Sequence, residues 1–227
     1  NTYGITVEYS SNNKLRNMAL ENNTYNFGIL GENISDYYQD IDISNTINGK
    51  PIYYIKEQNG LVFDATASIG YLGLVSCNNI KIANLTLTNN VQGVLLANTS
   101  HSTISNCTVH TNYYYGVRLY GSSNNIITEC NIYSNSKGLC PDYSSNNNTI
   151  SSCAVYNNTY ALWLYKYSNN NVITNCDVWN NYFGVMLSYS SNNQIENCDV
   201  YNNYYGIWLE YSLNNTNIAN CTVYNNS

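Results

Sequence analysis

Six cysteines recur along the chain at intervals of 22 or 23 residues, and this spacing decides which chemistry they could perform. They are Cys107, Cys130, Cys153, Cys176, Cys198 and Cys221. A fixed period in this range is typical of a solenoid in which each repeat forms one coil. Stacked coils lie about 4.8 Å apart, so we expect the six side chains to form a cysteine ladder.

Three kinds of chemistry fit such a ladder. Each cysteine is followed two residues later by a branched apolar residue, as in Cys176 and Val178, so both are expected to face the core, where a free thiol acts as a small apolar filler. Coil-to-coil disulfides are the second possibility, because the coil spacing falls within the Cα range of about 4.4–6.8 Å for disulfides. A soft-metal site such as one for Cu(I) is the third, but His101 and His110 are isolated and offer it no partner.

Two further cysteines lie outside this column. Cys140 stands two residues after Gly138, at a position predicted to face outward, and Cys77 falls near a Ser/Asn corner. We expect both thiols to be accessible, and an exposed thiol on a secreted protein suggests a bond to another subunit.

Carboxylates, bases and aromatic residues supply the other candidate chemistry. Polysaccharide lyases of solenoid architecture combine carboxylate-bound Ca²⁺ with a base, for which Arg118 and Lys166 are the candidates here. Apart from Glu210, neither has an acidic residue at a matching outward position, so we expect the carboxylates to be solvated and assign no catalytic, cofactor or metal residue. Trp163 and Trp208 are predicted to face outward and to serve either assembly or carbohydrate binding.

The elements that position these residues are short strands. Runs such as Gly116 to Leu119 alternate between apolar and polar residues, which indicates half-buried strands with Val117 inward and Arg118 outward. Asn-Asn and Ser-x-Asn-Asn clusters separate the runs and suit tight corners. With no helical periodicity, the sequence predicts an all-β parallel β-helix of roughly eight coils of 22–23 residues.

Composition limits the partners of this single domain, which spans residues 1–227. The net charge is −6 and charged residues make up 10% of the chain. Nothing neutralises phosphates in a row, which argues against nucleic acid. No apolar stretch reaches the roughly 18 residues of a membrane span, so we expect none.

Residues 32–74 interrupt the repeat. This insertion is expected to project sideways and to contain a hairpin in which Ile52 to Ile55 pairs with Leu61 to Phe63 across an Asn59-Gly60 turn.

One segment of the insertion carries a resemblance to a known family. Residues 40–54 read Asp-Ile-Asp-x-Ser-Asn-Thr-x-Asn-Gly-Lys-Pro-x-Tyr-Tyr. Together with the coils that follow, this segment resembles the NosD-like parallel β-helix repeat proteins of archaeal cell surfaces. The resemblance implies a right-handed helix, an extracellular or cell-surface location and no enzymatic activity. For such a setting, candidate N-glycosylation sites are Asn22, Asn33, Asn84, Asn98, Asn147, Asn157 and Asn214.

Both ends of the sequence lie in mid-repeat. Residues 1–7 match 203–209 and so contain a glycine-type strand without its preceding cysteine-type strand, whereas 221–227 contain only a cysteine-type strand. The first and last coils are therefore expected to be incomplete. A tail joined to the head of another copy would complete one coil, and such a head-to-tail contact produces a filament. The residues expected at this junction are Asn1, Tyr3, Gly4, Ile5, Val7, Cys221, Val223, Tyr224, Asn225 and Ser227.

These observations lead to one main hypothesis and two alternatives. The main hypothesis is a structural subunit of an extracellular archaeal filament, sheath or surface layer, with further copies of itself as partner. The first alternative is a carbohydrate-binding surface or adhesin, and the second is a polysaccharide lyase or epimerase.

Overall fold

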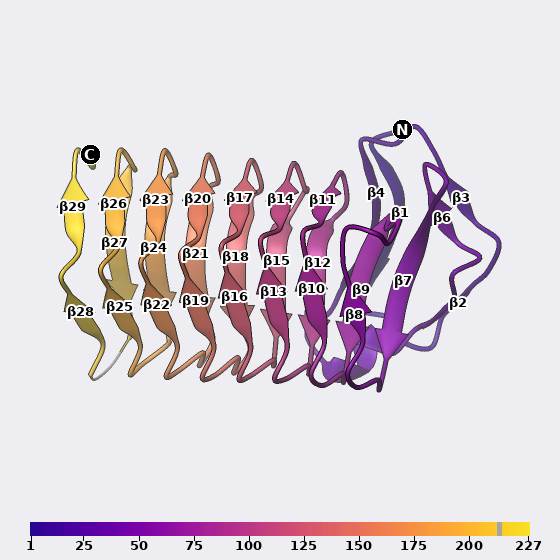
Figure 1. Ribbon diagram of the computed structural model, residues 1–227, viewed down its shortest axis with the longest axis horizontal. Coiled ribbons are helices and arrows are strands. Elements are labelled where there is room, and N and C mark those ends of the chain that lie inside the picture. Colours follow the sequence, from indigo (N-terminus) through magenta and orange to yellow (C-terminus); the bar gives the residue numbers. More distant parts are fainter. Residues whose placement is uncertain (213–214) are drawn as a thin grey trace.

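A stack of parallel coils dominates the structure (Figure 1), a computed structural model that describes residues 1–212 and 215–227. Successive coils contribute strands to three sheets, whose pairing is parallel except between β6 and β7. The ten-stranded sheet holds β3 (Ala19–Leu20), β6 (Thr46–Ile47), β7 (Lys50–Lys56), β9 (Tyr71–Val75), β12 (Gln92–Ala97), β15 (Tyr115–Tyr120), β18 (Lys137–Asp142), β21 (Tyr160–Tyr165), β24 (Phe183–Ser188) and β27 (Tyr205–Glu210).

The other two sheets close each coil. The eight-stranded sheet holds β8 (Val62–Phe63), β10 (Lys81–Ala83), β13 (Thr103–Ser105), β16 (Ile126–Thr128), β19 (Thr149–Ser151), β22 (Val172–Thr174), β25 (Gln194–Glu196) and β28 (Asn217–Ala219). The seven-stranded sheet holds β11 (Thr86–Thr88), β14 (Thr108–His110), β17 (Asn131–Tyr133), β20 (Ala154–Tyr156), β23 (Asp177–Trp179), β26 (Asp199–Tyr201) and β29 (Thr222–Tyr224). The predicted parallel β-helix is confirmed.

In-register pairing places identical sequence positions above one another. In the eight-stranded sheet, for example, Ile104 pairs with Ile127 and Ile127 with Ile150, and all three are fully buried. Because side chains alternate along a strand, one residue of each three-residue strand faces the core and its neighbours face out. The interior is therefore a set of apolar columns along the stack.

Residues 1–47 form two smaller coils of their own. The first consists of β1 (Tyr3–Glu8), β2 (Lys14–Leu15) and β3, and the second of β4 (Tyr25–Leu30), β5 (Asp40–Ile41) and β6, with the 3₁₀ helix η1 (Ile34–Tyr37) after β4. Parallel pairs β1–β4, β2–β5 and β3–β6 join them. With eight coils in the main stack, the chain makes ten turns, so the prediction of about eight coils was too low.

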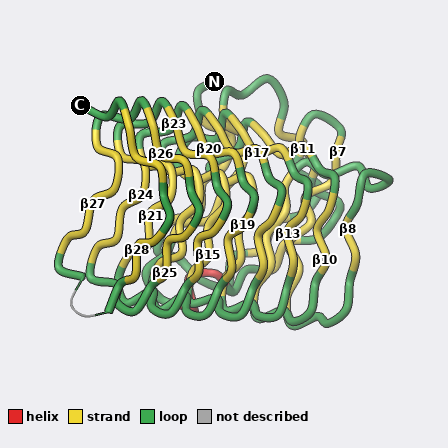
Figure 2. The backbone as a smooth tube through the Cα atoms, turned by 60° about the vertical axis from the view of Figure 1, so that its left-hand side comes forward, coloured by secondary structure: helices red, strands yellow, loops and turns green. Residues whose placement is uncertain are grey.

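These two N-terminal coils pack against the outer face of the ten-stranded sheet. Phe27, Ile29 and Tyr37 form a second apolar core with outward residues of that sheet, among them Tyr71 and Leu95. In Figure 2 the C-terminus lies at one end of the stack, whereas the N-terminus lies beside the stack. The outer face is thus covered at one end and open towards the other.

The predicted sideways insertion is wrong. β7 and β8 do not pair with each other; β7 pairs in parallel with β9, and β8 pairs in parallel with β10, so residues 50–63 belong to a coil of the main stack. The antiparallel pair joins β6 to β7 through Asn48 and Gly49, which both have positive φ. The sequence offers two Asn-Gly pairs, Asn48-Gly49 and Asn59-Gly60. The hairpin forms at Asn48-Gly49, because Asn59-Gly60 lies at a corner between two strands of the main stack.

Asparagine dominates the corners for two reasons. Exposed asparagines take up the left-handed conformation that a corner requires, at φ between 50° and 57° in the column Asn84, Asn106, Asn175, Asn197 and Asn220. Buried asparagines bond the coils together: Asn158 Oδ1 accepts the backbone N–H of Asn135 at 2.9 Å, and its Nδ2 donates to the carbonyls of Tyr156 at 2.9 Å and Ile132 at 3.2 Å. Each such amide serves polar backbone groups that water cannot reach.

Within the residues described, no helix is both long and apolar enough to cross a membrane.

The buried amide column gives a first prediction. Asn158→Ala removes the acceptor of the Asn135 N–H and the amide donor of two carbonyls, so the free energy of unfolding should fall by about 2–4 kcal/mol. Urea denaturation followed by circular dichroism measures the change. The control is Asn131→Ala at an exposed position of β17, which should change stability by less than about 0.5 kcal/mol. Equal losses in the two variants would contradict the role given to the buried amides.

Candidate functional site

A cleft opens where the N-terminal coils end and the outer face of the ten-stranded sheet becomes exposed. It has a volume of about 280 Å³. One wall comes from the N-terminal coils, through Tyr9 and residues 30–32, and the floor and other wall come from β15, β18 and β21. The side chains that matter chemically are Tyr114, Tyr115, Arg118, Lys137, Asp142, Tyr143, Trp163 and Lys166.

Arg118 and Asp142 form a buried ion pair at the floor of this cleft. Asp142 Oδ2 accepts from Nη2 of Arg118 at 2.9 Å and from Nε at 3.1 Å. Asp142 is 2% exposed and Arg118 is 4% exposed. Arg118 Nη2 also lies 3.5 Å from the carbonyl oxygen of Gly31. The expectation that Arg118 faces solvent without an acidic neighbour is wrong, because the N-terminal coils cover it and Asp142 lies on the next coil.

The charges of Arg118 and Asp142 stabilise each other in this buried position. Burial alone would lower the pKa of Arg118, but the Asp142 carboxylate beside it raises that pKa overall. Burial raises the pKa of Asp142 against the opposing effect of Arg118. A guanidinium held in this way stays protonated, so Arg118 cannot serve as the base considered from the sequence.

Lys137 is the cation that the cleft presents. Its Nζ lies 4.8 Å from the ring centroid of Trp163, 4.7 Å from that of Tyr115 and 5.0 Å from that of Tyr114. Nζ also donates to the Tyr115 hydroxyl at 3.3 Å. Burial lowers the pKa of Lys137, because the rings around it replace water without supplying a full negative charge.

Lys166 supplies a second cation at the mouth. Its Nζ donates to the Tyr143 hydroxyl at 2.6 Å, and this bond raises the pKa of Lys166. Among the residues described, neither lysine forms a salt bridge. The cleft therefore offers two ammonium groups among aromatic rings, with the Glu32 carboxylate also in its lining.

Aromatic residues elsewhere on the surface stack on one another. On the seven-stranded sheet, the rings of His110, Tyr133, Tyr156, Trp179, Tyr201 and Tyr224 form one column with centroid separations of 4.4–5.9 Å and interplanar angles of 3–11°. Each ring covers the faces of its neighbours and leaves only edges free. These columns stiffen the stack and leave little face area for a ligand.

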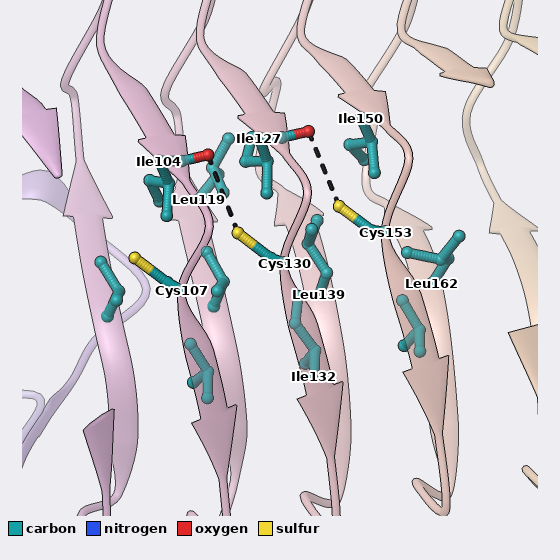
Figure 3. Packing of buried hydrophobic residues seen from close by; sticks show 14 of the residues in the cluster. Ile104, Cys107, Leu119, Ile127, Cys130, Ile132, Leu139, Ile150, Cys153 and Leu162 are labelled. Atoms are coloured by element: carbon teal, nitrogen blue, oxygen red, sulfur yellow. Dashed lines mark hydrogen bonds between the residues drawn. The ribbon is translucent and has the colours of Figure 1, made fainter. Parts of the chain in front are cut away.

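The cysteine ladder lies inside the main stack (Figure 3). Cys130 Sγ and Cys153 Sγ point to the carbonyls of Ile104 and Ile127 of the preceding coil, each at 3.8 Å. All eight cysteines are free thiols. The pKa of Cys107, Cys153 and Cys198 is raised, mainly by contact with the neighbouring thiol and in second place by burial. Cys107 to Cys198 thus face the core, as expected from the repeat, and are free thiols in this structure.

The two cysteines outside the column are buried as well. Cys140 is 1% exposed and Cys77 is 2% exposed, so the expectation of accessible thiols is wrong for both. Cys140 does face outward from β18, but the cleft wall covers it. Across the described part of the chain, no group of three or more His, Cys, Asp or Glu residues is arranged to hold a metal ion.

The N-terminal residues expected at the head-to-tail junction lie outside the main stack. Asn1 to Val7 do not supply the missing strand of a main-stack coil, because β1 pairs with β4 in a separate two-stranded sheet and Tyr3 packs on Tyr113. At the other end, Cys221 is half-buried, and Val223 and Tyr224 are exposed in β29. Sequon residues Asn22, Asn33, Asn84, Asn98, Asn147 and Asn157 are exposed, and Asn214 lies outside the described residues.

Sequence reasoning missed most of the cleft. Lys137, Asp142, Tyr143 and the covering role of residues 30–32 had no signal in a single repeat, because the cleft joins coils far apart in the chain. One signal was present: β18 reads Lys-Gly-Leu-Cys-Pro-Asp and so carries two charged residues, whereas β15 and β27 carry one each.

Comparison with known proteins settles the family. A family model for the right-handed β-helix region matches residues 1–170 and 92–227, which together span the chain. The chain belongs to the right-handed β-helix family. This confirms the predicted handedness, and no curated protein matches the sequence.

Solved structures show the same fold at low identity. The periplasmic alginate epimerase AlgG (T265N mutant) is 15% identical, with a TM-score of 0.52 over 98% of this chain and 48% of that one. The mannuronan C-5 epimerase AlgE6 A-module of Azotobacter vinelandii is 17% identical, with a TM-score of 0.52 over 88% of this chain and 55% of that one. The chain spans about half the length of these structures, and the likeness concerns the fold alone.

Thiol burial gives a second prediction. Iodoacetamide added without denaturant should label Cys221 first, because the other seven cysteines are buried. Mass spectrometry of the native and unfolded protein should show one rapid label and eight labels, respectively. Cys221→Ser should abolish the rapid label. Rapid labelling of Cys107 to Cys198 would contradict the inward facing of the column, and fewer than eight labels after unfolding would indicate disulfides.

Proposed function

We propose that the cleft between the N-terminal coils and the ten-stranded sheet binds an acidic polysaccharide. The observation that carries this proposal is the Lys137 ammonium, which lies among the rings of Tyr114, Tyr115 and Trp163 without a carboxylate partner. A carboxylate or sulfate on a sugar would supply the missing charge, and the rings would contact the apolar faces of the sugars.

The position of the cleft also supports a polymeric ligand. The outer face of the sheet continues beyond Lys137 through Trp163 to Trp208, without the N-terminal coils above it. A polymeric ligand could extend along this face, while the part of the ligand inside the cleft would lie against Leu30 and Tyr114. The two similar structures are named for alginate and mannuronan, which supports an acidic polymer as the ligand class.

The proposal concerns binding. Arg118 is occupied by Asp142, and burial raises the pKa of Tyr115, so neither is prepared to accept a proton at neutral pH. We further propose an extracytoplasmic location, where such polymers occur. We also propose that the chain is NosD-like and comes from an archaeal cell surface.

Substitution of the central cation tests this function. Lys137→Gln should weaken binding of oligouronates about tenfold or more, since a charge-assisted hydrogen bond contributes about 1.5–3 kcal/mol. Lys137→Arg should retain part of the affinity. The control is Lys81→Gln on the eight-stranded sheet, where the side chain is exposed. Isothermal titration calorimetry gives the Kd values, and equal affinities in the three variants and the native protein would contradict the proposal.

The same site predicts a pH dependence. Burial lowers the pKa of Lys137, so this lysine loses its proton at a lower pH than an exposed lysine does. Binding of a uronate requires the protonated form, and affinity should therefore decline as the pH rises through that lowered pKa. Titrations from pH 6 upward, at constant ionic strength, would show the decline in the native protein and its absence in Lys137→Gln.

Self-assembly is a second candidate function. The last coil leaves one edge of β27, β28 and β29 unpaired and exposes Leu209, Ile218 and Val223. Unpaired strand edges with apolar side chains favour the addition of another chain, so copies of this protein could join there, as an extracellular filament or layer requires. Because β1 lies outside the columns of the main stack, the partner surface would not be the one expected from the sequence.

Charge placed on that coil tests the candidate. Val223→Lys should shift the protein to monomers, whereas Ile126→Lys, at an exposed position of β16 in the middle of the stack, should not. Sedimentation velocity over a hundredfold concentration range measures the distribution. A native protein that stays monomeric throughout would remove self-assembly at this coil.

A further inference from the structure

A second cavity adjoins the cleft. It has a volume of about 530 Å³, within the range of about 300–1,000 Å³ for ligand pockets, and is lined by Tyr3, Thr6, Glu8, Leu30, Val91, Tyr113 and Tyr114. Leu30 and Tyr114 line both cavities. A ligand held against these two residues can therefore reach from one cavity into the other.

The two cavities differ in charge. The cleft carries Lys137 and Lys166, whereas none of the residues that line the second cavity is a lysine or arginine, and Glu8 is acidic. Among the residues described, Glu8 forms no salt bridge. A carboxylate of a ligand would be repelled there, but hydroxyl groups could donate hydrogen bonds to Glu8 and Thr6.

Ring geometry in the second cavity also differs from that of the surface columns. Tyr3 meets Tyr113 at an interplanar angle of 84° and a centroid distance of 5.0 Å, and Tyr113 meets Tyr114 at 81° and 5.2 Å. A ring that presents its edge in such a contact does not cover its own faces through it, although Tyr114 also stacks on Tyr115 at 25° and 5.6 Å. All three rings are also partly exposed, which suits contact with a sugar ring.

The Tyr3 phenol is the group with a shifted pKa in this cavity. Interaction with Tyr113, with burial as the second cause, raises the pKa of Tyr3 to about 12. The Tyr3 phenol therefore stays neutral at physiological pH and can act as donor and acceptor, which is what hydroxyl-rich neutral sugars require.

We propose that the second cavity is a subsite for neutral sugar residues beside the cationic cleft. The preferred ligand is then a mixed glycan, in which an acidic sugar lies by Lys137 and the neutral sugar next to it lies against Tyr113 and Tyr114. This inference rests on the proposed function, and it separates this chain from binders of uniform polyuronates.

Three oligosaccharides of equal length test the inference on the whole protein. They are a tetrasaccharide that alternates glucuronate with N-acetylglucosamine, tetragalacturonate and chitotetraose. Isothermal titration calorimetry should give the alternating tetrasaccharide a Kd about tenfold lower than that of tetragalacturonate. Chitotetraose, which lacks an acidic sugar, should bind more weakly than either.

Two variants locate the effect. Glu8→Gln removes the repulsion and should narrow the ratio between the alternating and uniform acidic ligands to about threefold or less. Tyr113→Ala should weaken the alternating ligand about tenfold, while Tyr211→Ala, an exposed tyrosine near the far end of the stack, should leave all affinities unchanged.

The outcomes separate the two proposals. Equal affinity for both acidic ligands, unchanged by Glu8→Gln, would overturn the neutral subsite and leave the acidic cleft in place. Binding of chitotetraose as tight as that of the alternating ligand, or no effect of Lys137→Gln on any ligand, would overturn the proposed function itself.

Discussion

Satisfaction of buried polar groups at the corners is the constraint on which this fold depends. Each coil turns sharply, and its corner backbone groups are closed off from water by the coils on either side. The side chains of Asn112, Asn135, Asn158, Asn181 and Asn203 meet this need, since each accepts from the preceding coil or donates to buried carbonyls. A buried polar group without a partner costs about 1–3 kcal/mol. The asparagine column at this corner therefore helps to keep successive coils in register.

That register determines where function can reside. Inward positions are fixed by packing, and outward positions on two of the sheets stack on their own kind, as the aromatic column from His110 to Tyr224 does. The outer face of the ten-stranded sheet is different because the N-terminal coils pack on it and interrupt the repetition. Tyr120 donates to the carbonyl of Glu32 and Arg118 approaches that of Gly31, so that the two units share a dry interface. The cleft lies where this interface ends.

Repetition also explains which features could be predicted from the sequence. The period, the inward cysteines and the corner asparagines each recur in many coils, so one chain provides its own alignment. The N-terminal coils do not repeat the pattern, and the choice between the Asn48-Gly49 and Asn59-Gly60 turns depends on which strand finds a partner in the stack. Cys140 shows the same limit: its outward direction follows from the repeat, but it is buried in a cleft that Tyr9 and Leu30, more than 100 residues away, also line.

The buried pair of Arg118 and Asp142 clarifies how charge is divided in the cleft. Breaking a buried ion pair by removing one partner costs about 3–5 kcal/mol, and Asp142 Oδ1 already lacks a hydrogen-bond partner among the described residues. The pair is thus costly to keep and more costly to disrupt, which is consistent with a role in holding residues 30–32 above the sheet. Arg118 is then a cation of the scaffold, and it contributes no net charge to a ligand. The positive potential of the cleft arises from Lys137 and Lys166, opposed by the Glu32 carboxylate in its lining, and both lysines are positioned by tyrosine hydroxyls. Because hydroxyls position an ammonium group without neutralising it, these two lysines remain available to an anion even though the chain as a whole is acidic.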